Sequence, residues 1–123
     1  MIIVKRDSLV SEKASVLQLS ACLCRELGLT PSATQISLHG NVLSVHLRHA
    51  LTSMARMIAH KDAGEEIVQG VYDVLLADCR ARLAALASEA TGQAVHQIRV
   101  AVDTHAETVV VEFLLREEGG RHA

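Results

Sequence analysis

The chain has 123 residues, with 50% hydrophobic residues, 12 basic and 14 acidic side chains and a formal net charge of −2. This length fits one domain, and the near-neutral charge with 2% aromatic residues excludes the basic and aromatic surfaces of nucleic-acid binders. No apolar run reaches the roughly 20 residues of a membrane span, so membrane insertion is excluded too. The amino terminus does not resemble a secretory signal, and the odd number of cysteines indicates no disulfide framework. We therefore expect a cytoplasmic protein.

The first element is predicted to be a helix over residues 8–27. Apolar residues in this range recur at helical spacing, and Ser8 can accept a hydrogen bond from a first-turn N–H. The helix is expected to end at Gly28, because glycine commonly follows the last residue of a helix. At the other end of the chain, we expect residues 117–123 to form a flexible tail, so that residues 1–116 form a single domain.

The spacing of apolar residues then changes from helical to strictly alternating over residues 35–48. Gly40-Asn41 lies in the middle of this range and suits a two-residue hairpin turn. With that turn, Ile36 is opposite Val45, and apolar residues face apolar ones throughout. A shift by one residue would destroy this agreement, so the register of the hairpin is predicted as well.

Helical spacing returns at Leu51, is interrupted at residues 62–64 and continues to a predicted end at Thr91-Gly92. The predicted core stripe of the longer helix is Val68, Tyr72, Leu75, Cys79, Leu83, Leu86 and Ala90. Its opposite side carries Val74, Ala77, Ala81, Ala84 and Ala85. Small residues there permit another helix to approach closely, which makes this side a candidate contact surface.

A second alternating pair follows, with His105-Ala106 at the turn. This register places Ile98 opposite Phe113 and Arg99 opposite Glu112, an oppositely charged cross-strand pair. The order helix, hairpin, helix, hairpin predicts an α+β fold: a two-layer αββαββ domain in which a four-stranded antiparallel sheet packs against helices.

One face of this sheet is expected to point away from the helices. Its polar members are Gln35, Ser37, Ser44, His46, Arg48, Gln97, Arg99 and Glu112, and its apolar members are Val42, Ala101, Val110 and Leu114. A half-apolar face suggests that another subunit covers it, so we expect a homo-oligomer. His46, Arg48, Arg99 and Glu112 are the candidate ligand or partner residues, and the alternative is an ordinary solvated face of an antiparallel sheet.

The histidines and cysteines do not occur at metal-ligand spacings, since HxxxH, HExxH and CxxC are absent from the sequence. Cys22 and Cys24 lie about 200° apart around a helix, so the two thiols cannot easily bind one ion. We expect Cys24 and Cys79 in the core and Cys22 on the surface. Because no nucleophile motif or phosphate-binding loop occurs either, we expect no metal, no cofactor and no catalytic residues.

The hairpin Ile36–Leu43, the Leu51-Thr52 helix start, the Thr91-Gly92 helix end and Asp103 ahead of Val111–Leu114 together resemble the MpsC-like family. The name refers to a Na+-translocating, membrane-potential-generating system. The resemblance spans most of the chain, and its domain was long described as one of unknown function. It implies a small soluble protein found with membrane systems for ion or inorganic-carbon uptake, and it supplies no catalytic residues.

Two functional hypotheses follow. The first is a non-enzymatic, cytoplasmic, self-associating accessory protein linked to a membrane ion or inorganic-carbon transport system. The alternative is a small-molecule or metal-binding sensor domain that uses the outward sheet face, with His46, Arg48 and Arg99 as contacts.

Overall fold

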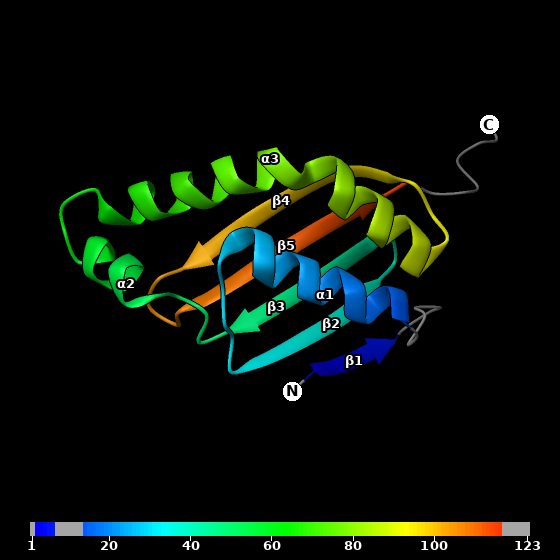
Figure 1. Ribbon diagram of the computed structural model, residues 1–123, viewed down its shortest axis with the longest axis horizontal. Helices are drawn as coiled ribbons and strands as arrows, with labels where there is room; N and C mark the ends of the chain where they lie inside the picture. Colours follow the sequence, from blue (N-terminus) through cyan, green and yellow to red (C-terminus); the bar gives the residue numbers. More distant parts are fainter. Residues whose placement is uncertain (1, 7–13, 117–123) are drawn as a thin grey trace.

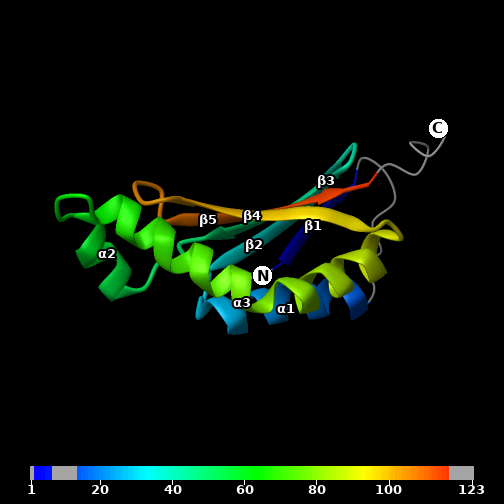
Figure 2. The ribbon, with the colours of Figure 1, turned by 90° about the horizontal axis from the view of Figure 1, so that it is seen from above.

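The computed structural model describes residues 2–6 and 14–116. The elements, in chain order, are β1 (Ile2–Arg6), α1 (Ala14–Leu27), β2 (Ala33–His39), β3 (Val42–Arg48), α2 (Ser53–Ala59), α3 (Gly64–Thr91), β4 (Val95–Asp103) and β5 (Thr108–Leu115). The strands form one layer, and α1 and α3 lie side by side against one of its faces (Figure 1). Figure 2 shows that none of the helices described here lies on the opposite face of the sheet.

The strand order in the sheet is β1-β2-β3-β5-β4. The two hairpins join through β3 and β5, which makes four antiparallel strands and confirms the predicted α+β fold. The structure adds β1, which pairs in parallel with β2 at the edge of the sheet. No element was predicted for this segment, because its partner lies across a long connection that leaves no local turn signal.

Both hairpins have the predicted registers. Ile36 pairs with Val45 in the first, and Gly40 takes a φ of +59° at its turn, a conformation that glycine adopts without steric cost. In the second hairpin, Ile98 pairs with Phe113, and the Asp103 carboxylate accepts hydrogen bonds from two backbone N–H groups of the turn. Side-chain alternation and turn chemistry together therefore determine both pairings.

The hydrophobic core lies between the helices and the inner face of the sheet. Leu19 and Leu23 of α1 and Leu83 of α3 are fully buried there against Val45 and Phe113 of the sheet. These residues come from the two long helices and from both hairpins, which therefore stabilise one another through a single core.

The inner side of α3 differs from the predicted stripe at two positions. Leu76 and Ala87 are buried, whereas Leu75 and Leu86 are only partly buried. A stripe at helical spacing can step by three or by four residues, and sequence alone does not determine where each step falls. The other five predicted positions are buried, as expected.

The predicted interruption at residues 62–64 is confirmed as the junction between α2 and α3. Thr52 caps α2, since its hydroxyl accepts a hydrogen bond from the Ala55 N–H at 3.1 Å. A β-carbon on Gly64 would overlap the carbonyl oxygen of Ile58, so only glycine permits the two helices to meet so closely.

The ends of the other predicted helices also agree with the structure. Gly28 follows α1 with a φ of +66°, and Gly92 caps α3 with a φ of +77°. Ser8 and the first residues of the predicted 8–27 helix lie outside the described residues, as does the predicted tail 117–123. The single-domain boundaries therefore stay a prediction.

Candidate functional site

The two registers place all of the predicted outward residues on one face of the sheet. Rows of residues run across the strands, for example Ser37, Ser44, Glu112 and Arg99. Within the described residues, the helices pack only on the other face (Figure 2). We call this uncovered surface the outer sheet face.

The structure brings two of the four candidate residues into contact. Arg99 donates a hydrogen bond from Nε to Glu112 Oε1 at 2.8 Å across β4 and β5. Arg48 instead donates to the side-chain oxygen of Gln35 at 3.3 Å. Ser44, which pairs with Glu112, precedes Arg48 by four residues, which is about 13 Å along a strand. His46 lies between them, opposite Val110, so the four residues share a face without forming one cluster.

The apolar members of the outer sheet face are interleaved with these polar side chains. Val42, Val110 and Leu114 are partly buried by their neighbours, and Ala101 is exposed. The face is therefore a broad, mixed surface, which suits contact with another protein better than enclosure of a small molecule.

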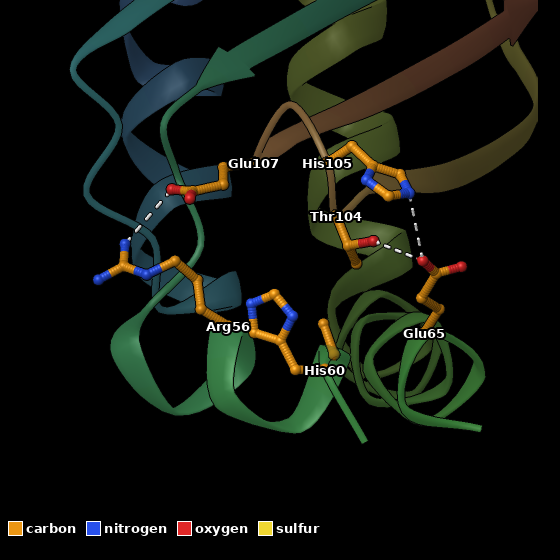
Figure 3. Close-up of a pocket in the computed structure, with 7 residues that line it drawn as sticks. Arg56, His60, Glu65, Thr104, His105 and Glu107 are labelled. Atoms are coloured by element: carbon orange, nitrogen blue, oxygen red, sulfur yellow. Dashed lines mark hydrogen bonds and ion pairs between the residues drawn. The ribbon is translucent and has the colours of Figure 1, made fainter. Parts of the chain in front are cut away.

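A polar pocket of about 180 Å³ lies at the end of the domain where α2, the start of α3 and the β4–β5 turn meet (Figure 3). Thr104 donates a hydrogen bond to Glu65 Oε2 at 3.0 Å, and His105 Nε2 lies 3.7 Å from the same oxygen. On the other side, Arg56 Nη1 is 3.3 Å from Glu107 Oε1, and the ring of His60 lies between the two pairs. Both carboxylates of the pocket thus have partners.

The sequence analysis did not predict this pocket. The turn at His105-Ala106 and the helix break at residues 62–64 were predicted separately. Their proximity depends on how α2 and α3 pack over the end of the sheet, and no local pattern carries that information. The sequence feature that could have indicated the pocket is the occurrence of histidine and glutamate residues both at the turn and at the helix break.

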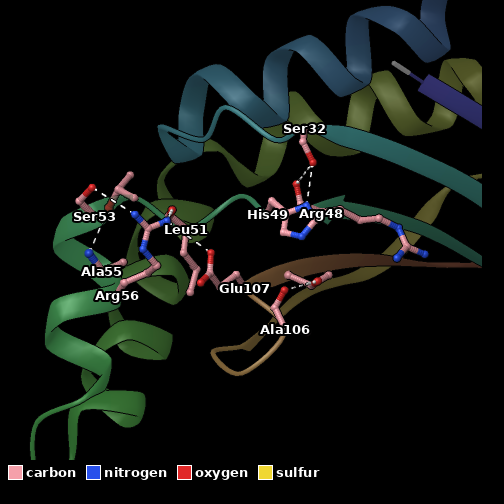
Figure 4. A network of polar contacts seen from close by, with 11 residues as sticks. Ser32, Arg48, His49, Leu51, Ser53, Ala55, Arg56, Ala106 and Glu107 are labelled. Carbon is pink, nitrogen blue, oxygen red and sulfur yellow. Dashed lines mark hydrogen bonds and ion pairs between the residues drawn. The ribbon is translucent and has the colours of Figure 1, made fainter.

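A network of hydrogen bonds connects this end of the domain to the sheet (Figure 4). The Ala50 N–H donates to the Glu107 carbonyl at 2.9 Å, and Ser32 Oγ lies 2.9 Å from His49 Nδ1. Arg56 donates to the Leu51 carbonyl. His49, Glu107 and also Ala63 have positive φ values of 51°, 56° and 60°, a backbone conformation that costs energy in residues other than glycine.

The cysteines are arranged differently from the prediction. Cys22 is buried and Cys24 only partly buried, so the predicted assignment of these two was wrong, whereas Cys79 is buried as expected. The reason is that α3 packs on the side of α1 that carries Cys22 and Glu26, as the ion pair between Glu26 and Arg82 indicates.

Burial, reinforced by the nearby Glu26 carboxylate, raises the pKa of the Cys79 thiol. The pKa of Cys24 is raised by burial as well. Thiols with raised pKa values are poor nucleophiles and poor metal ligands at neutral pH. Within residues 2–6 and 14–116, no group of three or more His, Cys, Asp or Glu residues is placed to hold a metal ion.

The fold and the outer sheet face define a small α+β protein with a broad exposed surface. The family described as the Na+-translocating membrane potential-generating system (MpsC) matches residues 14–117, and the chain belongs to this family. Comparisons with curated proteins and with solved structures give no match. Across the described helices, none has the length and apolar character needed to cross a bilayer.

Proposed function

We propose that this member of the MpsC family is a non-enzymatic, cytoplasmic accessory protein of a Na+-translocating membrane-potential-generating system. It self-associates, and it binds a protein component of that system. The family's description supports the link to such a system. The observation that carries the binding role is the outer sheet face, which no described helix covers and which mixes apolar with charged side chains.

The absence of an enzymatic role is supported by the state of the reactive side chains. Burial raises the pKa values of the Cys24 and Cys79 thiols, which favours their neutral forms. The Glu65 carboxylate accepts a hydrogen bond from Thr104, and the Glu107 carboxylate forms an ion pair with Arg56. A neutral thiol is a weak nucleophile, and a carboxylate that is already bound to a neighbouring side chain is poorly placed to transfer a proton to a substrate.

The test is reconstitution with the membrane components of such a system in sealed vesicles. We expect the chain to bind these vesicles and to increase the Na+-dependent membrane potential. The double variant Arg99→Glu with Leu114→Asp should abolish both effects, because it places new negative charge on the β4–β5 side of the outer sheet face. Leu17→Asp on α1 is the matched control, since Leu17 is also an exposed apolar residue but lies on the helix side. Unchanged binding by the double variant would contradict the proposal.

The alternative function is a ligand-binding sensor. The observation that favours it is the pocket that contains His60 and His105, rather than the outer sheet face, where Arg48 and Arg99 already have partners. A thermal-shift screen with divalent metals, nucleotides and bicarbonate tests this function. A ligand that raises the melting temperature of the wild type but not of His60→Ala would support the sensor.

A further inference from the structure

The outward side of α2 and α3 carries a contiguous apolar surface. Its large side chains are Met54, Met57, Ile67, Val71 and Val74, whose exposed fractions range from 48% to 70%. We call these five residues the α2–α3 patch. Among the described residues, Leu17 on α1 is the one further exposed large hydrophobic side chain, so the exposed apolar groups are concentrated here. Such concentration marks an interaction site rather than the scattered apolar residues of an ordinary surface.

The patch is also hollowed. A groove of about 120 Å³ runs between α2 and α3, with Val68 and Tyr72 among its lining residues. Met54 and Val71 line the same groove, and methionine side chains adapt readily to the shape of a partner. The surface therefore offers both a ridge, along α3, and a depression beside it.

The ridge along α3 changes in size from one end to the other. Ile67, Val71 and Val74 occupy one stripe of the helix in its amino-terminal half, since they are spaced by four and three residues. The same stripe continues toward the carboxyl end with small residues, Ala77, Ala81 and Ala85, all exposed. In an antiparallel pair of α3 helices, the large residues of each helix would lie against the alanines of the other. This contact between large and small residues would therefore form at both ends of the helix pair.

The charges beside the stripe agree with the same arrangement. Asp73 and Arg80 are seven residues apart, so they lie on the same flank of α3, two turns from each other. Suppose that Val74 packs beside Ala77 of an antiparallel second copy. Asp73 of the first copy then lies opposite Arg80 of the second, and the two-fold symmetry places Arg80 of the first copy opposite Asp73 of the second. In a parallel arrangement this flank of each copy would lie on opposite sides of the contact, so Asp73 and Arg80 of the two copies would not meet.

We propose that a second copy of this chain docks on the α2–α3 patch, with the two α3 helices antiparallel about a two-fold axis near residues 74–78. The proposal rests on the self-association in the proposed function and specifies its surface. It leaves the outer sheet face free for the partner protein.

The size of the surface is consistent with this arrangement. A helix of 28 residues is about 42 Å long, and a stable interface buries about 800 Å² on each partner. One helix face alone is narrower than this requires, so Met54 and Met57 of α2 have to contribute. Both are exposed beside the groove.

The test measures the dimer dissociation constant by light scattering after size-exclusion chromatography and by sedimentation. Val74→Asp should raise this constant by about 100-fold, because it replaces two apolar side chains per dimer with charges near the two-fold axis. Leu17→Asp should leave it unchanged. Since Val74 is 69% exposed, circular dichroism should show both variants folded.

Charge reversal tests the antiparallel direction separately. Asp73→Arg and Arg80→Asp should each weaken the dimer by about tenfold, and the double variant should restore it, because the exchanged charges again attract. Asp78 is the acidic residue within the stripe, near the two-fold axis, so Asp78→Ala should tighten the dimer. A double variant that is weaker than either single variant would overturn the proposed arrangement.

The outcomes separate this inference from the proposed function. A dimer that Val74→Asp leaves intact but Leu114→Asp disrupts would overturn the α3 interface and preserve self-association. A wild-type chain that stays monomeric at its highest soluble concentration would overturn the inference and self-association together. It would not affect binding of a transport component to the outer sheet face.

Discussion

The two outward surfaces of the domain differ in how their apolar groups are arranged. On the outer sheet face, Val42, Val110 and Leu114 are partly buried among polar neighbours such as the paired Arg99 and Glu112. On the helix side, the α2–α3 patch is contiguous, and its members are about half exposed or more. The first surface can remain in water without a partner, whereas the second exposes apolar area that a partner would remove from water.

This difference suggests a division of roles. Interfaces that stay closed are more apolar than those that form and separate repeatedly. The α2–α3 patch has the character of a lasting contact between copies, and the outer sheet face has that of a reversible contact with another protein. Substitutions on opposite sides of the same element test this difference.

The largest difference is expected between adjacent residues of β5. Phe113 is fully buried in the core and Leu114 lies on the outer sheet face. Phe113→Ala should lower the free energy of unfolding by about 3–5 kcal/mol, because it leaves a cavity. Leu114→Ala should cost less than about 1 kcal/mol, since that side chain is partly solvated. Urea unfolding measures the free energy of unfolding of both variants. Equal decreases would show that Leu114 is as deeply buried as Phe113, and hence that other residues cover the outer sheet face.

The next largest difference is expected between two glycines of α3. Gly64→Ala should cost about 1–3 kcal/mol, since the new methyl group would clash with the Ile58 carbonyl. At Gly70, nothing lies within 4 Å of the position that a β-carbon would take, so Gly70→Ala should stabilise the helix by about 0.5–1 kcal/mol. Thermal unfolding distinguishes the two signs. Destabilisation by Gly70→Ala would indicate that this side of α3 is already closely packed against something.

A smaller effect is expected from pH. Burial raises the pKa of Cys79 above its ordinary value of 9.0 and that of Tyr72 above 10.0, so folding favours their neutral forms. The resulting stability is complete below the ordinary thiol pKa and declines as the pH rises toward the folded-state values. Urea unfolding from neutral pH to about pH 10.5 should show this decline. Cys79→Ala should make it less steep, and a flat profile in the wild type would contradict the burial of these groups.

The smallest effect is expected at the Arg99–Glu112 pair. Arg99 is largely exposed, so a double-mutant cycle with alanine should give a coupling of about 0.2–1 kcal/mol at low salt. The coupling should decrease in 1 M salt, where charges are screened over about 3 Å. A larger, salt-insensitive coupling would mean that the outer sheet face is shielded from water and is no more exposed than the core side of the sheet.

Most of the fold could be predicted because its signals are local. Each hairpin combines alternating side chains with a short turn, and these two constraints determined the pairing of Ile36 with Val45 and of Ile98 with Phe113. Gly28 and Gly92 marked helix ends for the same reason, since few other residues adopt the backbone conformation required there.

The features that escaped prediction depend on contacts between distant segments. The parallel pairing of β1 with β2 has no local signal, and the burial of Cys22 instead of Cys24 depends on which side of α1 meets α3. The residues that share the outer sheet face could be predicted because two local registers define it, and their role in binding stays a prediction. The polar pocket was not, because Glu65 and His105 meet only after α3 has packed over the sheet.

Three residues other than glycine have a left-handed backbone conformation: His49 between β3 and α2, Ala63 between α2 and α3, and Glu107 between β4 and β5. Each holds a conformation that costs about 1 kcal/mol or more, and glycine would adopt it freely. Protein engineers who seek a more heat-resistant form should therefore begin at these three connections.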